Sequence, residues 1–255
     1  MEVHAHAHTE RKKWTRYIWE FLMLFLAVSL GFLVENQREH YVEHQRAKIY
    51  AANLYEELKK DTARLNFVID RSREIAGRLD TFCILVKEKN RQNITSGMLY
   101  FYANAVTQVE YFSSSNTTVE QLKGSGNLRI MGNELAYKIS EYDKLIRELE
   151  KEYDLSRAEF GKMEDRHFKM IDVYLSEIMF AEREDPRDSV FMVNDLPVNK
   201  DPVLMREYTG WAKFESNIYL YQVRRYLSPI KQSATELIVF LKKKYHLSEN
   251  TPSKK

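Results

Sequence analysis

The distribution of proline and glycine constrains this chain more than any other feature. All five prolines lie at or after Pro186, and the 255 residues include only eight glycines. Proline removes a backbone donor and clashes with the preceding helical turn, and glycine costs about 1 kcal/mol relative to alanine inside a helix. No segment combines alternating apolar residues with the Asn-Gly or Asp-Gly turns of a β-meander. The sequence therefore predicts an all-α fold.

The most apolar segment is residues 17–34, YIWEFLMLFLAVSLGFLV, in which Glu20 is the only charged side chain. At ~1.5 Å of rise per residue, a helix of this length covers roughly 27 Å, close to the thickness of a bilayer core. The segment is longer than the apolar core of a cleaved signal peptide, and no small-x-small cleavage site follows it. We therefore expect a single transmembrane helix over 17–34, in preference to a buried helix of a soluble domain.

The residues that flank this segment predict its orientation. Four cations precede it, namely Arg11, Lys12, Lys13 and Arg16, whereas the three that follow, Arg38, Arg46 and Lys48, are diluted by glutamates. Positive charge is retained on the cytoplasmic side of a span. We expect the arm 1–16 in the cytoplasm and the domain 35–246 on the extracytoplasmic side, which in a Gram-negative bacterium is the periplasm and makes the anchor an inner-membrane one. Glu20 lies less than one turn inside the span and four residues after Arg16, so it is expected either to snorkel to the interface or to pair with Arg16.

The remaining composition excludes several classes of function. The chain has 39 Lys and Arg against 37 Asp and Glu, a net charge of +2, with both signs interspersed. Nucleic-acid binders usually carry a basic patch on one face, so no nucleic acid is expected as a partner. The single Cys83 excludes an internal disulfide and a Cys-based zinc site.

The first part of the domain reads as a long helix from Glu35 to about Lys89. Its apolar residues recur at gaps of 3, 4 and 7, which is typical of one face of a bundle helix. They are Leu54, Leu58, Leu65, Val68, Ile75, Leu79, Phe82 and Val86. Only Gly77 interrupts the run, and no break separates it from the apolar segment. We therefore expect span and stripe to form one continuous helix.

Two shorter helices are expected next. The first covers residues 98–112 and is capped by Thr95 and Ser96; its aromatic residues fill the end of a bundle or, alternatively, line a ligand pocket. Residues 113–116, Ser-Ser-Ser-Asn, form a turn. Thr117 and Glu120 then have the spacing of a capping box that opens the second helix, which ends at residues 123–126.

The segment 117–131, TTVEQLKGSGNLRIM, and the following NELAYKISEY at 133–142 carry a resemblance. They are similar to the central motif of an uncharacterised family of single-pass membrane proteins of Bacteroidota, in which a Thr-rich start leads through Leu to Ser-Gly-Asn-Leu. The resemblance covers roughly residues 15–145 and includes the juxtamembrane run 35–39, ENQRE. It implies a bacterial, membrane-anchored helical protein and brings no known activity, substrate or catalytic residue.

A third long helix is expected from about Asn133 to Glu184. Gaps of 3 and 4 alternate through Ile139, Tyr142, Ile146, Leu149, Tyr153, Ser156, Phe160, Met163, His167, Met170 and Tyr174, the pattern of a bundle seam. A long connection to Pro202 follows, in which the apolar residues 190–193 are expected to pack on the bundle. Residues 247–255 are expected to form a disordered tail.

The last helix is expected from Val203 to Tyr245, with a kink at Pro229. Trp211, Phe214, Ile218 and Tyr221 share one predicted apolar stripe, and Leu227, Ile230, Ala234, Leu237 and Leu241 form the next. The sequence thus predicts one N-terminal transmembrane helix continuing into an antiparallel bundle of three long helices plus two short ones.

Histidines and arginines are the candidate ligand-binding residues. His4, His6 and His8 alternate in the N-terminal arm, and His40 and His44 lie one helical turn apart, but neither set has an identifiable further ligand. His167 lies in the predicted seam, where a core role competes with pH sensing. Arg224 and Arg225 lie among tyrosines, where a solvated face competes with anion binding. No metal or cofactor is expected.

No catalytic motif is present. The sequence contains no Gly-rich phosphate loop, no His-Glu-x-x-His and no nucleophile elbow, so an enzyme is not expected. The leading hypothesis is an envelope scaffold or interaction protein that binds a protein partner or forms a homo-oligomer. The alternative is an extracytoplasmic sensor of ligand or pH that acts through a partner. A pocket lined by Tyr100, Tyr102, His167 or Arg224 favours the sensor, and a solid core with an exposed apolar stripe favours the scaffold.

Overall fold

The computed structural model describes residues 14–88, 92–181 and 191–247. The described residues are all-α, with 85% of the structure helical and no β-strand, which confirms the predicted fold class. His4, His6 and His8, and the predicted tail from residue 248 on, lie outside the described residues. The chain divides into two compact units, residues 1–49 and 50–255.

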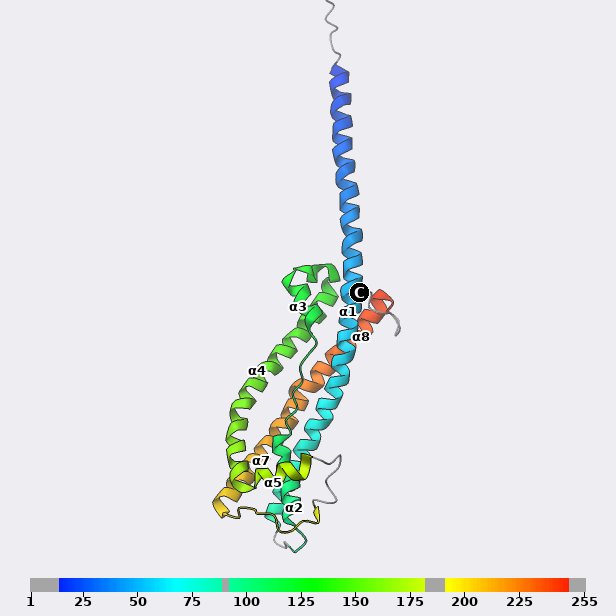
Figure 1. Ribbon diagram of the computed structural model, residues 1–255. Coiled ribbons are helices and arrows are strands. Elements are labelled where there is room, and N and C mark those ends of the chain that lie inside the picture. The colour runs from blue at the N-terminus through cyan, green and yellow to red at the C-terminus, as the bar shows by residue number, and fades with distance from the viewer. Residues whose placement is uncertain (1–13, 89–91, 182–190, 248–255) are drawn as a thin grey trace, which may run out of the picture. The chain divides into compact units, whose positions relative to one another are not determined.

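Among the described residues the structure has seven α-helices with defined bounds, two 3₁₀ turns and one π turn (Figure 1). In order they are α1 (Trp14–Lys87), α2 (Ser96–Ala103), η1 (Asn104–Thr107), α3 (Thr117–Gly124), η2 (Asn127–Met131), α4 (Asn133–Met170), α5 (Val173–Ala181), α7 (Pro202–Gln222), η3 (Val223–Leu227, the π turn) and α8 (Ser228–Tyr245), with residue 191 in a further helical position. As predicted, the apolar segment 17–34 and the stripe Leu54–Val86 belong to one helix.

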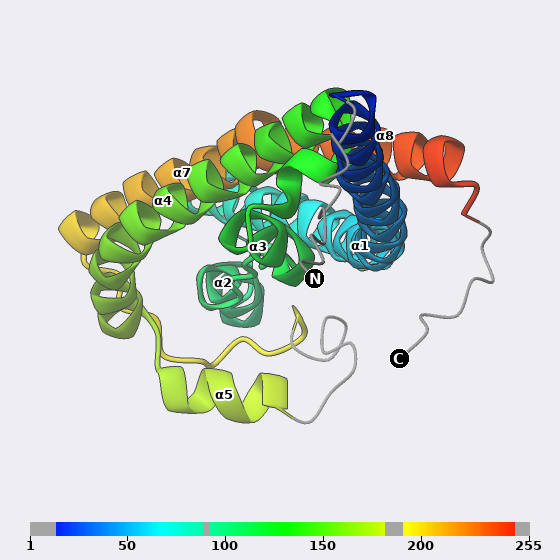
Figure 2. The ribbon, with the colours of Figure 1, turned by 90° about the horizontal axis from the view of Figure 1, so that it is seen from above.

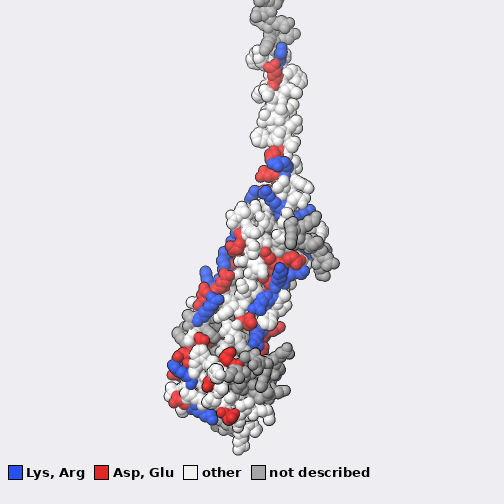
Figure 3. All heavy atoms as spheres, viewed as in Figure 1, with Lys and Arg blue, Asp and Glu red and all other residues white. Residues whose placement is uncertain are grey.

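The first unit contains the N-terminal part of α1. Its most apolar window of 18 residues has a mean hydropathy of 2.1 and is 0% buried, so this helix is long and apolar enough to cross a membrane. Figure 3 shows it as a stretch with very few charged side chains. Arg16 Nε donates to Glu20 Oε1 at 3.2 Å, which confirms the predicted pair.

The second unit is a bundle of three long helical segments. From Tyr50 on, α1 and α4 run in the same direction, and α7 and α8 run back between the same two ends (Figure 1). The C-terminal helices pack against both α1 and α4, and α4 and α7 lie side by side in Figure 2. Lys, Arg, Asp and Glu are interspersed over the bundle face seen in Figure 3.

Apolar residues with helical periodicity form the core of this bundle. Buried positions include Leu54, Leu58, Leu65, Val68, Ile75, Leu79 and Phe82 of α1, Ile139, Tyr142, Ile146, Leu149 and Tyr153 of α4, and Ile230, Ala234, Leu237 and Leu241 of α8. Each fully buried large side chain contributes roughly 1.5–3 kcal/mol. The stripes predicted for α1, α8 and the first half of α4 are therefore confirmed.

The chain returns along α1 in an extended segment, residues 108–116, which we call the return segment. Glu110 pairs with Arg64, Ser114 with Asp61 and Thr118 with Glu57, so the segment runs antiparallel to α1. The predicted helix 98–112 is therefore wrong beyond residue 107. Side chains of α1, distant in sequence, satisfy this backbone and replace the helical bonds.

The predicted third helix also ends early. Ile171 is extended (φ −124°, ψ 155°) and forms an isolated bridge with Val198, which divides the predicted helix 133–184 into α4 and α5. Tyr100 Oη accepts from the backbone N of Asp172 at 2.9 Å, and Asp172 Oδ1 accepts from Leu175 N at 3.1 Å. The break turns Tyr174 outward, 73% exposed, so its place in the predicted seam is wrong.

The C-terminal helical run is continuous but changes its winding before Pro229. The π turn η3 joins α7 to α8 and ends at Leu227, two residues before Pro229. Pro229 has no backbone N–H to donate, so the regular helical bonding is interrupted here. On α7 the buried face includes Tyr208, Ala212, Ser216 and Tyr219. The stripe predicted there is wrong by one position, because Phe214 and Tyr221 are exposed.

Candidate functional site

A buried carboxylate of α1 binds the return segment to α4. Asp61 is only 3% exposed and accepts hydrogen bonds from the Ser114 hydroxyl, from Ser115 N at 2.8 Å and from Tyr142 Oη at 2.7 Å. Burial raises the pKa of Tyr142, so its hydroxyl keeps the proton that it donates. Further along the same segment, the Phe112 N–H donates to Tyr153 Oη at 3.2 Å, and burial raises the pKa of Tyr153 to about 12.

One turn earlier, Glu57 of α1 caps the short helix α3. Its Oε1 accepts from Thr118 Oγ1 at 2.8 Å, and its Oε2 accepts from Thr118 N at 3.1 Å. The helix begins after Asn116, whose side chain makes no cap bond, so the predicted capping box of Thr117 and Glu120 does not form. Desolvation raises the pKa of Glu57, and the bonds from Thr118 oppose that rise. These contacts give the Ser- and Thr-rich stretch a structural role.

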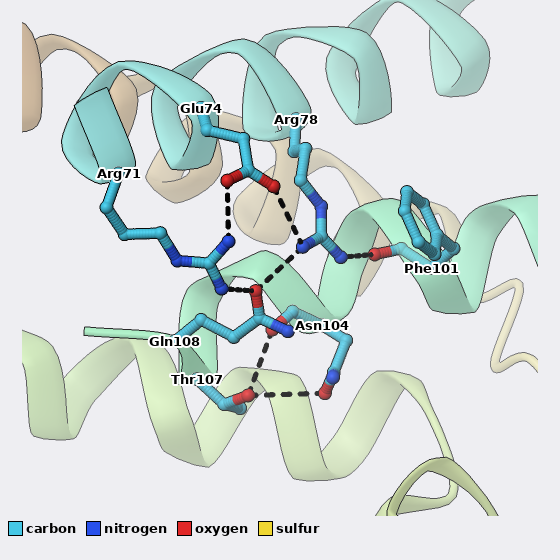
Figure 4. A network of polar contacts seen from close by, with 7 residues as sticks. All are labelled: Arg71, Glu74, Arg78, Phe101, Asn104, Thr107 and Gln108. Atoms are coloured by element: carbon cyan, nitrogen blue, oxygen red, sulfur yellow. Dashed lines mark hydrogen bonds and ion pairs between the residues drawn. The ribbon is translucent and has the colours of Figure 1, made fainter. Parts of the chain in front are cut away.

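A second polar network lies where η1 meets the return segment (Figure 4). Gln108 Oε1 accepts from Arg71 and from Arg78, the latter at 2.7 Å, and Arg78 also donates to the Phe101 carbonyl at 2.6 Å. The Arg78 guanidinium lies 4.2 Å from the Phe101 ring centroid. Glu74 pairs with Arg71 at 2.6 Å. The charged groups of this network all bond to backbone or side-chain groups of the fold. We therefore assign the network a structural role.

His167 is fully buried between α4 and α7. Its Nδ1 lies 2.9 Å from Tyr208 Oη, and that hydroxyl donates its single proton to the Ala103 carbonyl at 3.2 Å. The hydroxyl must therefore accept from Nδ1–H, which makes Nε2 the unprotonated nitrogen. Nε2 is buried without a hydrogen-bond partner among the described residues. Burial lowers the pKa of His167 to about 4, so the ring is neutral at pH 7.

The other residues singled out in the sequence do not converge on a site. His40 and His44 are exposed on the first unit, and no group of three or more His, Cys, Asp or Glu residues able to hold a metal occurs in the described parts of the chain. Tyr100 is buried and bonds to the Pro197 carbonyl. Arg224 and Arg225 are exposed, and Arg225 lies 5.4 Å from the Tyr226 ring centroid.

The apolar residues predicted to pack on the bundle do so in part. Val190 lies outside the described residues, and Met192 is exposed. Phe191 packs edge-on against Phe101, with ring centroids 5.1 Å apart, and its carbonyl accepts from Thr95 Oγ1 at 2.7 Å. The connection before α7 therefore covers the aromatic end of α2, and this end is packed core.

A groove between α1 and α8 is the largest hollow of those described, at about 790 Å³. We call it the α1–α8 groove. Its apolar side chains are Ile69 of α1 and Val239 and Phe240 of α8, and Val239 is 62% exposed. Such exposed apolar surface beside charged residues is a frequent mark of binding sites.

Charges of both signs rim the α1–α8 groove, with cations in excess. Four lining residues are basic, Arg73, Lys138, Lys231 and Lys243, and two are acidic, Asp70 and Glu236. Asp70 is paired with Arg73 at 3.5 Å, and Glu236 accepts from Gln232 at 3.0 Å. A smaller hollow of about 190 Å³, which includes the exposed Tyr137, shares Lys138 and Glu236 with the groove. The sequence did not predict this groove. A signal for it in the sequence is the apolar Val239 between Lys231 and Lys243 on α8.

Comparison of the chain with models of protein families, with curated proteins and with solved structures finds no match. The resemblance of residues 15–145 to a membrane-protein family therefore stays a prediction. The geometry of the bundle and its grooves is what bears on function.

Proposed function

We propose that this chain is a membrane-anchored interaction protein whose bundle binds a helix of a partner protein. Residues 17–34 serve as the anchor, with the N-terminal arm in the cytoplasm and the bundle on the other side. The α1–α8 groove is the partner site. The apolar side chains that line this groove, with Val239 exposed and Phe240 half-buried, are the observation that carries the proposal.

The shape and chemistry of the groove favour a helical occupant. Two long helices form its walls, and an amphipathic helix can lay an apolar face along such a groove. Val239 and Phe240 offer the apolar contact, and Tyr137, which lines the smaller hollow that shares two residues with the groove, is the kind of residue that often contributes most to binding.

The charge of the rim specifies the flanks of that helix. Lys231 and Lys243 lie on the rim, and neither contacts a carboxylate among the described residues. Asp or Glu on the partner would pair with them, and rim charges of this kind guide association more than they add affinity. We therefore infer a partner helix with an apolar face between acidic residues.

The sensor alternative has less support. None of Tyr100, Tyr102, His167 and Arg224 lines a described groove, and the first three lie wholly or partly inside packed structure. His167, with its pKa at about 4, changes charge below the range in which histidine sensors usually act. The solid core and exposed apolar groove favour the scaffold.

Site-specific photo-crosslinking tests the partner site. Val239 is replaced by p-benzoylphenylalanine in the full-length chain in its native membrane, and Leu155 of α4, which is 70% exposed and lies outside the groove, is the matched control. We expect a crosslink to a second protein from position 239 and none from 155. The crosslinked peptide should read as an amphipathic helix with acidic flanks.

Charge reversal provides the second arm of this experiment. The pair Lys231→Glu and Lys243→Glu should reduce crosslinking from position 239 at least tenfold, because two attractive contacts become repulsive. A crosslink only to another copy of this chain, or equal crosslinking from positions 239 and 155, would refute the proposal.

The anchor is tested separately with a periplasm-dependent reporter fused after Lys255. We expect an active fusion that alkaline carbonate does not extract from membranes. Activity only with a cytoplasm-dependent reporter would contradict the orientation, and extraction by carbonate would contradict the anchor.

A further inference from the structure

A second groove lies between the C-terminal end of α1 and the N-terminal half of α7. It measures about 720 Å³, within the range of small-molecule sites, and we call it the α1–α7 groove. All of its lining residues belong to the second unit. It shares no lining residue with the α1–α8 groove, so its role is independent of the proposed partner site.

Every charged residue that lines this groove is a cation. They are Lys87 at the end of α1, Lys200 before α7, and Arg206 and Lys213 on α7. The chain as a whole carries nearly equal numbers of the two signs, 39 against 37, and the α1–α8 groove contains both. The α1–α7 groove is therefore a local concentration of positive charge on a chain whose charges nearly balance.

Most of this charge is not neutralised by the described protein. Lys213 pairs with Asp80 at 2.8 Å, which holds its ammonium in place at one wall of the groove. Among the described residues, none of Lys87, Lys200 and Arg206 lies within ion-pair distance of a carboxylate. Three like charges around one hollow repel one another, and an anion between them relieves that repulsion.

The backbone N–H groups at the N-terminus of α7 do not provide the anion-binding groups of this groove. Asp201 already caps the helix, since its Oδ1 accepts from Leu204 N at 2.8 Å, and Pro202 at the first position has no N–H to offer. Any anion in the groove would therefore be held by the side chains of the four cations. An Arg and three Lys suit carboxylate and phosphate oxygens.

The floor of the groove is apolar. Val86 of α1 and Met205 of α7 line the groove, and both are partly buried against the core cluster. An inorganic ion would leave this surface in water, whereas an organic anion would cover it. Methionine adapts to differently shaped apolar groups. The site thus fits a molecule with an anionic head and an apolar body.

We propose that the α1–α7 groove binds an organic anion that carries a phosphate or carboxylate group on an apolar body. The cations hold the anionic group, and Val86 and Met205 contact the apolar part. This chemistry is shared by soluble organic phosphates and by the headgroup region of an anionic lipid.

The test is calorimetric titration of the full-length chain in phosphatidylcholine nanodiscs, with empty nanodiscs subtracted. The probes are 1-naphthyl phosphate, 1-naphthol and inorganic phosphate. We expect saturable binding of naphthyl phosphate, at least tenfold tighter than that of either fragment, because only the intact probe uses both parts of the groove. The affinity should fall as ionic strength rises. Nanodiscs that contain phosphatidylglycerol distinguish the sources: competition with the probe identifies a lipid headgroup, and no competition identifies a soluble anion.

The pair Lys200→Gln and Arg206→Gln removes two of the cations and breaks no ion pair of the described structure. It should weaken naphthyl phosphate binding by about tenfold or more, because hydrogen bonds to charged groups are lost on both side chains. The matched control, Lys144→Gln with Lys151→Gln, removes the same charge from exposed positions of α4 and should leave binding unchanged. Both variants should keep the circular dichroism spectrum of the parent chain. No saturable binding at millimolar probe, or an equal loss in both variants, would overturn the proposal.

Discussion

Removing the hydrogen bond between Asp61 and Tyr142 should destabilise the bundle more than any exposed change on α4. Asp61 and Tyr142 are 3% and 1% exposed, and the phenol donates to Oδ2 at 2.7 Å. The carboxylate also holds the backbone of Ser115 and the hydroxyl of Ser114, so it joins three segments of the chain. The perturbation is a double-mutant cycle of Asp61→Asn and Tyr142→Phe.

The expected magnitude follows from the number and kind of bonds. A hydrogen bond to a charged group contributes about 1.5–3 kcal/mol, and Tyr142→Phe removes one such bond while it keeps the ring packed. Asp61→Asn weakens three bonds but preserves volume and one acceptor, so we expect a loss of about 2–3 kcal/mol. The double variant should lose about 1.5–2 kcal/mol less than the sum of the single losses, because the shared bond is counted twice in that sum.

The assay is urea unfolding of the full-length chain, followed by circular dichroism at 222 nm. Tyr137→Phe is the control, since that hydroxyl is exposed on the same helix, and it should change the free energy of unfolding by less than about 0.5 kcal/mol. Hydrogen exchange at the Ser115 amide should also accelerate in Asp61→Asn. Losses that add to within about 0.5 kcal/mol would show that the Asp61–Tyr142 bond does not contribute as argued.

Two further predictions concern a buried ring and two glycines. Burial lowers the pKa of His167 in the folded chain to about 4, whereas in the unfolded chain histidine keeps its ordinary pKa of 6.5. Between pH 6.5 and 4 the unfolded chain therefore binds a proton that the folded chain does not. The free energy of unfolding should fall over this range by on the order of 3 kcal/mol. In His167→Gln the free energy of unfolding should change less between pH 6.5 and 4, by that same amount. An equal pH dependence in the variant and the parent chain would contradict the buried neutral ring. Gly132→Ala should cost about 1–3 kcal/mol, because φ is +81°, ψ is 150° and the new Cβ would lie 3.1 Å from Lys244 Nζ. Gly126→Ala should cost less, about 1–2 kcal/mol, because φ is +68° there but nothing lies within 4 Å of the added Cβ. Thermal melts compare the stability of the two variants. A larger loss for Gly126→Ala than for Gly132→Ala would contradict this account.

The long helices could be predicted because their information is local. Leu54 through Phe82 recur at helical spacing on α1, and the same holds for Leu227 through Leu241 around α8. Thr95 likewise caps α2 as predicted, with its Oγ1 3.1 Å from Met98 N. In each case the residues that determine the element lie within it, so a sequence window is sufficient.

The return segment and the break in α4 could not be predicted in this way. The sequence favours helix at residues 108–112 and at Ile171, and partners far away in the chain override that preference. Arg78 and Tyr153 bond to the return segment at Gln108 and Phe112. At the break in α4, Tyr100 bonds to the Asp172 N–H and Val198 bridges to Ile171. Tertiary contacts of this kind routinely outweigh helix propensity, which amounts to less than about 1 kcal/mol per residue.

The buried face of α7 was misassigned for a related reason. The aromatic residues suggested that Phe214 and Tyr221 face the core, but the buried positions include Glu215 and Gln222. Gln222 Nε2 donates to Ser156 Oγ at 2.9 Å across to α4. A polar residue is buried at low cost when its partner is in place, and no sequence pattern shows that partner.

The stretch that carries the resemblance to other sequences is largely accounted for by folding. Its Thr118 and Tyr142 donate to Glu57 and Asp61, and Gly126 and Gly132 adopt positive φ at the turns that lead into α4. A motif explained by such contacts marks how the chain reverses direction, and it gives no reason to place a ligand there. Two surfaces that these contacts leave unexplained are the α1–α8 groove, where Val239 is exposed, and the α1–α7 groove, where Lys87, Lys200 and Arg206 have no carboxylate partner among the described residues. Function is therefore best sought at α7 and α8, outside the region of the motif.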